Sequence, residues 1–350
     1  MDDMRLETLP RIRLANLPTP LEEMPNLAKR LGGPRLFVKR DDVTGLGLGG
    51  NKTRKLEYIM ADAQAKHADT IITGAGFQSN WCTQTACAAK RLGMDVILVK
   101  QGPREGYDPA EYDGNQLLHA LLGAEIHVAP SRARADELIR SLADDLRRRG
   151  RTPYVIGAAG STPLGVAGYV NAILEVLTQA IQQGITISHI VHATGSGGTQ
   201  AGLVLGAKAF NTGIQVLGIS VSPSDDRVET ITRLVTASAE FFDLDVSVTA
   251  SDVTVIDDYV GAGYGVIYRE VVEALHLVAD AEGVFLDPVY SGKAMVGLID
   301  LISKHYFQKE DTVLFLHTGG TPALFPYKGP IKAFMKHEAP AWVRPAWSPT

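Results

Sequence analysis

Cysteine is scarce in this sequence, and its histidines show no spacing typical of metal sites. Only Cys82 and Cys87 occur among the 350 residues. Their separation of five positions within one expected helix suits neither a disulfide framework nor a CxxC metal site, so we interpret both as ordinary thiols. The nine histidines lack HxxxH spacing, and no metal centre is predicted.

Excess positive charge and long apolar runs are also missing. The net charge of −5 gives no electrostatic reason to expect binding to nucleic acid or to an acidic membrane surface. The start of the chain, MDDMRLETLPRIRL, has acids where a secretory signal has basic residues. No apolar run reaches the about 20 residues that span a bilayer. We therefore expect a cytoplasmic protein whose partner is a small molecule.

Short β-branched runs alternate with longer helical patterns along the chain. This alternation predicts an α/β fold of open, mostly parallel sheets with crossover helices. The length suggests two lobes, since about 100–200 residues form one domain. Strands are expected at residues 36–39, 70–73, 95–100, 125–128, 154–156, 189–192, 215–221, 252–256 and 313–317. Helices are expected at residues 80–92, 115–122, 134–149, 164–181, 200–209, 227–239, 265–281 and 292–306.

Four turns rich in Gly, Ser, Thr or Asn follow expected strands. They lie at residues 73–80, 157–162, 193–199 and 317–321. Open α/β sheets bind their ligands at the carboxyl ends of strands. The sequence therefore predicts that these turns form one composite site.

The turn in ATGSGGTQAG, residues 193–202, has the composition of an anion site. Glycine permits positive φ, which turns backbone N–H groups inward, and a helix N-terminus adds partial positive charge. The dinucleotide pattern G-x-G-x-x-G fails because its third glycine would fall at Gln200, and no acid follows at the required distance. The pattern favours a bound monophosphate over a purely structural turn, and both over a dinucleotide.

Lys52 lies in GLGLGGNKTRK, residues 45–55, which nearly matches a P-loop. Asn51 separates the glycine from the lysine and breaks that motif. Three roles stay open from the residues alone: a phosphate-binding lysine, a solvated surface lysine, or an amine that captures a carbonyl group. An accessible lysine together with a phosphate loop is what pyridoxal phosphate requires.

Six ordered motifs resemble the D-cysteine desulfhydrase and 1-aminocyclopropane-1-carboxylate deaminase family. They are GGNKTRKLEY (49–58), GAGFQSNWCTQTACAAKRLGM (74–94), ATGSGGTQAG (193–202), GAGYG (261–265), LDPVYSGKAM (286–295) and LHTGGTPALF (316–325). The resemblance implies pyridoxal 5'-phosphate as cofactor, held in a cleft between two domains of the fold shared with the tryptophan synthase β-subunit. It implies a large domain of residues 1–52 plus 164–340, a smaller domain of residues 53–163, an irregular tail at 341–350, and a homodimer.

The resemblance also assigns roles to individual residues. Lys52 would form the Schiff base, Asn80 would contact the phenolic oxygen of the cofactor, and Lys52, Ser79, Tyr264 and Tyr290 would be catalytic. The cofactor site would comprise Asn51, Lys52, Asn80, Thr194, Gly195, Ser196, Gly197, Gly198, Thr199, Ser291 and Thr318. The substrate site would comprise Gln78, Ser79, Asn80, Trp81 and Ser161. Taken alone, each tyrosine could instead be a packing residue.

Two departures from the family pattern bear on the reaction. Ser291 replaces a glutamate that lies beside the pyridine nitrogen in the deaminases, so Ser291 and Thr318 become candidates for that position. A hydroxyl there suits β-elimination, in which little negative charge is stored on the ring. Trp81 replaces a polar residue, either as a packing residue or as part of a reshaped substrate pocket.

We therefore predict a β-eliminating, deaminating lyase that acts on a small amino acid. D-Cysteine is favoured, with pyruvate, hydrogen sulfide and ammonia as products. L-Cysteate and other β-substituted alanines stay open, and deamination of the cyclopropane acid ranks below them. A protein from another class would use the glycine loops to bind an anion or nucleotide without catalysis. Neither the enantiomer nor the group that removes the Cα proton follows from the sequence.

Overall fold

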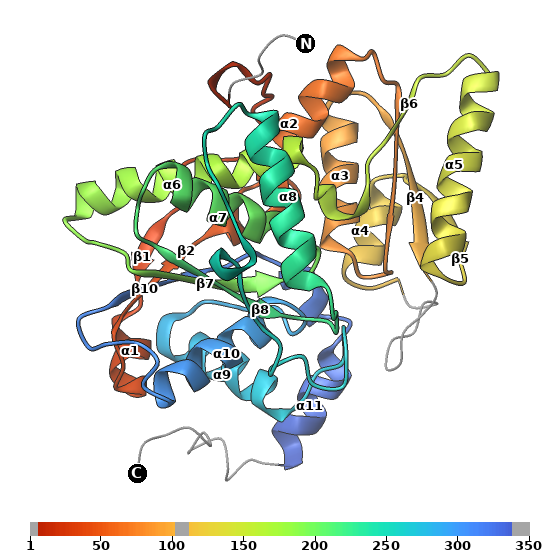
Figure 1. Ribbon diagram of the computed structural model, residues 1–350. Helices are drawn as coiled ribbons and strands as arrows, with labels where there is room; N and C mark the ends of the chain where they lie inside the picture. Colours follow the sequence, from red (N-terminus) through yellow and green to blue (C-terminus); the bar gives the residue numbers. More distant parts are fainter. Residues whose placement is uncertain (1–5, 102–111, 338–350) are drawn as a thin grey trace.

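The computed structural model describes residues 6–101 and 112–337, which form two sheets with helices on both faces (Figure 1). The larger sheet has the strand order β1-β2-β10-β7-β8-β9, and its pairs are parallel except for β1 with β2. Its strands are β1 (Leu21–Glu23), β2 (Arg35–Lys39), β7 (His189–Thr194), β8 (Gln215–Ser220), β9 (Thr254–Ile256) and β10 (Thr312–Leu316). The predicted α/β class is confirmed.

The smaller sheet is entirely parallel, with the strand order β5-β4-β3-β6. Its strands are β3 (Thr70–Ala75), β4 (Asp95–Gln101), β5 (Glu125–Ala129) and β6 (Pro153–Val155). All four come from the middle of the chain, so this sheet interrupts the sequence of the larger one. The exact domain boundaries stay a prediction, and the expected tail at 341–350 lies outside the described residues.

Apolar helices cover both faces of the larger sheet, and its central strands β7 and β10 are buried on both sides. Along β2, Phe37 contacts the core formed with α6, α7 and α8, whereas Leu36 and Val38 contact the core formed with α1, α9 and α10. This alternation follows the two-residue period of a strand. The helices are α1 (Pro25–Leu31), α6 (Pro163–Gln183), α7 (Gly198–Ala209), α8 (Arg227–Phe241), α9 (Arg269–Glu282), α10 (Ser291–Ser303) and α11 (Lys328–His337).

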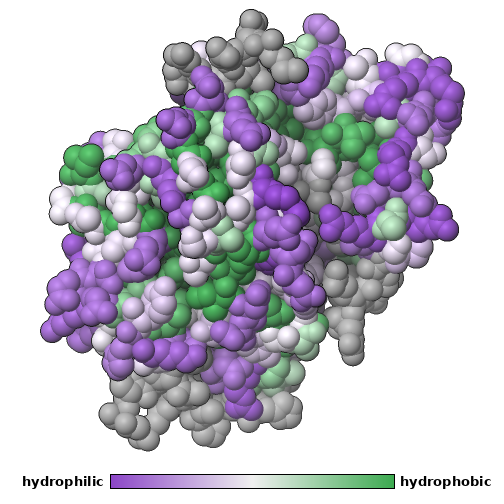
Figure 2. Space-filling model, viewed as in Figure 1, coloured by the Kyte–Doolittle hydropathy of each residue, from purple (hydrophilic) through white to green (hydrophobic). Residues whose placement is uncertain are grey.

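The smaller sheet has α2 and α3 on one face and α5 on the other. Figure 2 shows hydrophilic side chains over the outer edge of this unit, where α5 exposes its arginines and acids. The helices are α2 (Lys52–Ala65), α3 (Asn80–Arg91), α4 (Asn115–Leu121) and α5 (Arg132–Arg148). Cys82 and Cys87 both lie in α3 as free thiols, as predicted.

Helix α6 corrects the expectation that no apolar segment reaches membrane-spanning length. It has 21 residues, and its most apolar window is long and apolar enough to cross a bilayer by composition alone. That window is 56% buried within the structure, and α6 contributes side chains such as Val170 and Ile173 to the core. The helix is therefore accounted for as a core element.

Candidate active site

Lys52 is the first residue of α2 and follows a tight glycine turn. Gly49 and Gly50 have φ values of 78° and 129°, which favour glycine. A Cβ atom at Gly49 would lie 1.8 Å from the Asp42 carbonyl oxygen, and one at Gly50 would lie 2.4 Å from the Gln84 side chain. The two glycines therefore let the backbone pass closely enough to bring Lys52 to the carboxyl ends of the strands.

Asn51, which breaks the P-loop motif, joins the lysine turn to two other turns. Its Nδ2 donates to Thr199 Oγ1 at 3.1 Å. Its backbone N–H donates to the Thr318 carbonyl at 3.0 Å. Ser161 makes a further link, since its hydroxyl donates to Ser196 Oγ at 2.8 Å. Turns after β2, β6, β7 and β10 thus meet in one place.

Burial changes the acidity of the Lys52 amine. The side chain is half-buried, and loss of water around the ammonium lowers its pKa to about 8. A lysine with this pKa is partly neutral near physiological pH and can attack a carbonyl group. This environment fits a carbonyl-capturing amine better than an ordinary solvated lysine.

The loop of residues 195–199 leads from β7 into α7, and no side chain among the described residues caps the first N–H groups of this helix. Gly197 has φ 81° and supplies no side-chain cap to α7. A Cβ atom at Gly198 would lie 2.6 Å from Ser161 Oγ and 2.8 Å from Lys55 Nζ. The uncapped N-terminus, with Ser161 Oγ and Lys55 Nζ packed close beside Gly198, forms a cradle suited to a phosphate group.

Lys55 was missed by sequence reasoning, although it lies one helical turn after Lys52. It is fully buried, and Nζ has no hydrogen-bond partner within the part of the chain that the structure describes. Burial, and then the charge of Lys52, holds its pKa well below the usual value. An orphaned amine beside the cradle fits a dianionic phosphate, which would restore its charge. The i, i+3 spacing from Lys52 is the sequence signal that could have found it.

Ser79 and Asn80 lie at the N-terminus of α3, as predicted for a carboxylate site. Ser79 is the N-cap residue, and its hydroxyl oxygen accepts the Cys82 N–H at 3.2 Å. Its own proton is therefore free for another acceptor. Gln78, by contrast, is used within the structure, since it bonds to Asp113 and Asn115.

Trp81 lies in the core beside this helix end. It is 3% exposed, and its indole N–H donates to Thr73 Oγ1 at 2.8 Å. A Cβ atom at Gly160 would lie 2.8 Å from the Trp81 ring, so the ring supports the turn that carries Ser161. The placement favours the packing alternative. Trp81 has almost no exposed surface with which to contact a substrate, as the other alternative requires.

Tyr264 and Tyr290 face each other from the glycine loop at residues 261–265 and the start of α10. Their hydroxyl groups are hydrogen-bonded, and their rings meet edge to face with centroids 5.7 Å apart. Burial and the neighbouring Tyr264 raise the pKa of Tyr290 well above its usual value. Tyr290 therefore keeps its proton at physiological pH and can serve as a donor.

The Ser291 hydroxyl is already hydrogen-bonded within the structure. The Ser291 hydroxyl donates to Asp287 Oδ1 at 2.7 Å and accepts the Asp287 N–H at 2.8 Å. Because a hydroxyl has one proton, Ser291 cannot also donate to a pyridine nitrogen in this arrangement. Ser291 and Thr318 both stay predicted neighbours of the pyridine nitrogen, and the bond to Asp287 disfavours only a donor role for Ser291.

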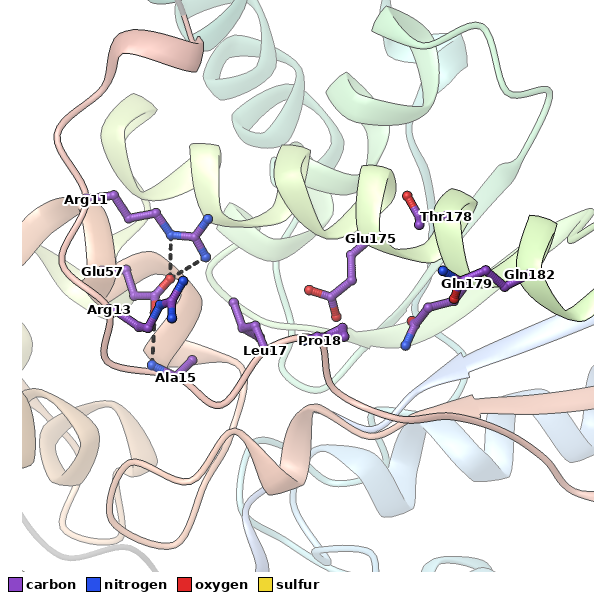
Figure 3. A pocket seen from close by; sticks show the side chains of 10 residues that line it. All are labelled: Arg11, Arg13, Ala15, Leu17, Pro18, Glu57, Glu175, Thr178, Gln179 and Gln182. Atoms are coloured by element: carbon purple, nitrogen blue, oxygen red, sulfur yellow. Dashed lines mark hydrogen bonds and ion pairs between the residues drawn. The ribbon is translucent and has the colours of Figure 1, made fainter.

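A separate hollow of about 540 Å³ lies between the N-terminal segment and α6 (Figure 3). Its carboxylates are already paired, Glu57 with Arg11 and Glu175 with Lys39. None of the predicted site residues lines it. The hollow therefore offers no substitute for the site around Lys52.

Two mostly parallel α/β sheets, a lysine of lowered pKa and an anion cradle are what an enzyme needs to hold a phosphorylated carbonyl cofactor. The chain belongs to the pyridoxal-phosphate dependent enzyme family, whose model matches residues 12–319. The predicted cofactor is thereby confirmed.

Individual relatives refine this assignment. The chain is 40% identical to a D-cysteine desulfhydrase of Klebsiella pneumoniae (strain 342) over 329 residues, which cover 93% of this chain and 99% of the relative. A solved structure of an ACC deaminase homologue is 38% identical, with a TM-score of 0.86 over 94% of this chain and 97% of the other. A diaminopropionate ammonia lyase of Escherichia coli, 17% identical with a TM-score of 0.59 over 95% of this chain and 88% of the other, shares the fold. The predicted family resemblance is confirmed.

Proposed function

We propose that the protein is a β-eliminating, deaminating lyase whose preferred substrate is D-cysteine. The observation that carries this proposal is the 40% identity to a D-cysteine desulfhydrase over nearly the whole length of both chains. The replacement of a deaminase-type glutamate by Ser291 supports elimination over opening of a cyclopropane ring. Membership of the family removes the alternative of a nucleotide-binding protein without a cofactor.

Residues from different turns around Lys52 would hold different parts of the cofactor. Lys52 would be the point of covalent attachment, and the loop at residues 195–199 with Lys55 would hold the phosphate. Thr318 would lie near the pyridine nitrogen and Asn80 near the phenolic oxygen. When bound, pyridoxal phosphate supplies an electron sink that makes the Cα–H bond of an attached amino acid acidic.

Other side chains would act on the substrate. The N-terminus of α3 would bind the carboxylate through its free N–H groups and the helix dipole. Lys52, neutral above about pH 8, can accept the Cα proton, and Ser79 is the alternative base. Tyr264 or Tyr290, whose hydroxyl groups are hydrogen-bonded to each other, would give a proton to the departing group.

A substrate screen tests the proposal. We would measure keto acid release from D-cysteine, L-cysteine, L-cysteate, serine, chloroalanine and 1-aminocyclopropane-1-carboxylate. We expect kcat/KM for D-cysteine to exceed the others by at least about tenfold. Sulfite release from L-cysteate as the dominant reaction would support that alternative instead. Turnover of the cyclopropane acid alone would contradict the proposal.

Lys52→Ala tests the mechanism directly. We expect turnover to fall about 10⁴-fold, which corresponds to about 5.5 kcal/mol, because the variant lacks both the attachment point and the base. The purified wild-type protein should be yellow, and borohydride should bleach it and fix the cofactor to Lys52. Lys66→Ala, at the exposed end of the same helix, is the control. Full turnover in Lys52→Ala would refute the assignment.

Two further properties belong to the proposal. We propose a homodimer in the cytoplasm. Sedimentation of the purified protein at two concentrations distinguishes a dimer from a monomer. A monomeric, fully active species would remove the dimer from the proposal without affecting the reaction.

A further inference from the structure

A buried polar network joins α4 to the N-terminus of α3, and the mechanism above does not use it. Its centre is Asn115, the first residue of α4, which has no exposed surface. The Asn115 side chain bonds to Thr83, Gln78 and Asn80. Buried polar side chains are costly unless their groups are satisfied, so each of these contacts constrains the others.

One contact fixes the orientation of the Asn115 amide. Its Nδ2 donates to the backbone carbonyl of Gln78 at 3.1 Å, and a carbonyl oxygen can only accept. The same Nδ2 donates to the Asn80 amide at 2.8 Å. The Asn80 atom that faces Asn115 must therefore be Oδ1, and its Nδ2 points the other way.

The contact that the Asn115 side-chain oxygen makes is consistent with this orientation of the amide. Thr83 Oγ1 lies 2.6 Å from Asn115 Oδ1 and donates to it. The single Thr83 proton is then used, so His119 Nε2, 2.8 Å from the same hydroxyl, must be the donor to Thr83. Burial and the charge of Lys100 lower the pKa of His119 to about 2, so its ring is neutral. The hydrogen bonds run in one direction, from His119 through Thr83 and Asn115 to Asn80.

We propose that Asn115 is a positioning residue, which fixes the Asn80 amide so that its N–H₂ group faces the cofactor's phenolic oxygen. Asn80 is half-buried, and its Nδ2 has no partner among residues 6–101 and 112–337, so it is free for the cofactor. If the Asn80 amide were reversed, its Oδ1 would face the phenolic oxygen of the cofactor, and no hydrogen bond could form between them. The inference deepens the proposed site but depends on the cofactor alone, so it stands or falls separately from the choice of substrate.

Asn115→Asp reverses the network. A carboxylate has no N–H to donate, so Asn80 must turn its N–H₂ group toward Asp and its oxygen toward the cofactor. An N–H donor stabilises the phenolate and lowers the pKa of the bound chromophore, and its loss raises that pKa. We expect the pH midpoint of the visible absorption to rise by about one unit and the dissociation constant for pyridoxal phosphate to rise about tenfold. Midpoint and affinity unchanged in a folded variant would overturn the proposal.

Thr83→Val is a milder variant with a matched control. Valine keeps the shape of Thr83 but breaks the chain of donors, and we expect a shift of the absorption midpoint in the same direction as in Asn115→Asp. Thr85 is also a fully buried threonine of α3, and its hydroxyl lacks a partner among the residues the structure describes. Thr85→Val should therefore leave the spectrum unchanged. An equal shift in both variants would mean general loosening of α3 and would overturn the proposal.

A double-mutant cycle separates positioning from packing. If Asn115 acts through Asn80, Asn115→Ala should change the absorption midpoint and cofactor affinity in the wild type but not in Asn80→Ala. Thermal unfolding of the cofactor-free proteins shows how far each change affects stability alone. Additive effects on the spectrum would show that Asn115 acts by another route and would refute the proposal. If Asn115→Asp does not fold, Thr83→Val and this cycle decide the question.

Discussion

Helix α2 carries buried charges of two kinds. On one side, Arg54 donates to Asp41, Glu175 and Thr19 through hydrogen bonds of 2.8 to 3.0 Å. On the other, the amine of Lys55 has no partner within the described chain. Both side chains are almost completely buried, at 2% and 0% exposure.

The difference shows which charges serve the fold and which await a ligand. Desolvation disfavours a charged group, and only a partner restores the balance. Arg54 keeps its charge, since Asp41 and Glu175 hold its pKa well above the usual value. Lys55 shows the opposite shift. A buried base without a partner is therefore the better marker of the cofactor site.

The largest expected effect on stability comes from replacement of Arg54, the buried charge that has partners. Arg54→Leu leaves Asp41 and Glu175 buried without their main partner, and we expect the free energy of unfolding to fall by about 3–5 kcal/mol. Urea denaturation of the cofactor-free protein measures this loss. Arg233→Leu, which breaks an exposed pair with Glu229, should cost at most about 0.5 kcal/mol. Similar losses of unfolding free energy in Arg54→Leu and Arg233→Leu would show that the buried pairing of Arg54 contributes no more than an exposed ion pair.

Replacement of the unpaired Lys55 should have the opposite effect on the stability of the cofactor-free protein. Lys55→Met removes an amine whose burial is uncompensated without phosphate, so the cofactor-free protein should become more stable. The same change removes a charge-assisted bond to phosphate, and we expect cofactor affinity to fall about tenfold to a hundredfold. Thermal unfolding and equilibrium dialysis measure the two effects.

Lys66→Met is the control for this pair of measurements, because Lys66 is the exposed residue that follows the last residue of the same helix. It should change neither stability nor affinity appreciably. A Lys55→Met protein that is less stable and binds the cofactor as tightly as the wild type would place Lys55 with the structural charges.

The fold was largely predictable from hydrophobic periodicity, and α2 shows where that signal ends. The expected strand at 95–100 corresponds to β4 and the helix at 80–92 to α3 within a residue or two. Helix α2 was missed because it is buried on almost every side, with Arg54, Lys55 and Glu57 inside. Because charged residues lie on its buried faces, the segment is not divided into the apolar and polar faces that the pattern detects. The short elements α1 and β1 were missed because few residues carry the signal.

The site was predictable where it depends on backbone chemistry and less so where it depends on partners. Glycines at the Lys52 turn and at 195–199 indicate close approaches that the structure contains. The use of the Ser291 hydroxyl by Asp287 and the burial of Trp81 depend on contacts between side chains, which one sequence does not reveal. Asn115, 35 positions from Asn80, lay beyond any local pattern.

The smallest expected effect is on the pH dependence of cofactor attachment, which depends on the protonation of Lys52. Its pKa in the folded protein is lowered to about 8, below the about 10.4 of a free lysine. Attachment of the cofactor needs the neutral amine, so the rate of reconstitution from cofactor-free protein should rise about fivefold between pH 7 and 8 and at most about twofold above that. An unperturbed lysine would instead give a rise of about tenfold per unit up to about pH 9. Because the folded state binds this proton less tightly than the unfolded state, the shift costs stability below about pH 8, and that cost disappears between about pH 8 and 10.4. Stopped-flow absorbance of the wild type measures the profile, and a rate that still rises about sevenfold between pH 9 and 10 would place Lys52 among ordinary solvated lysines.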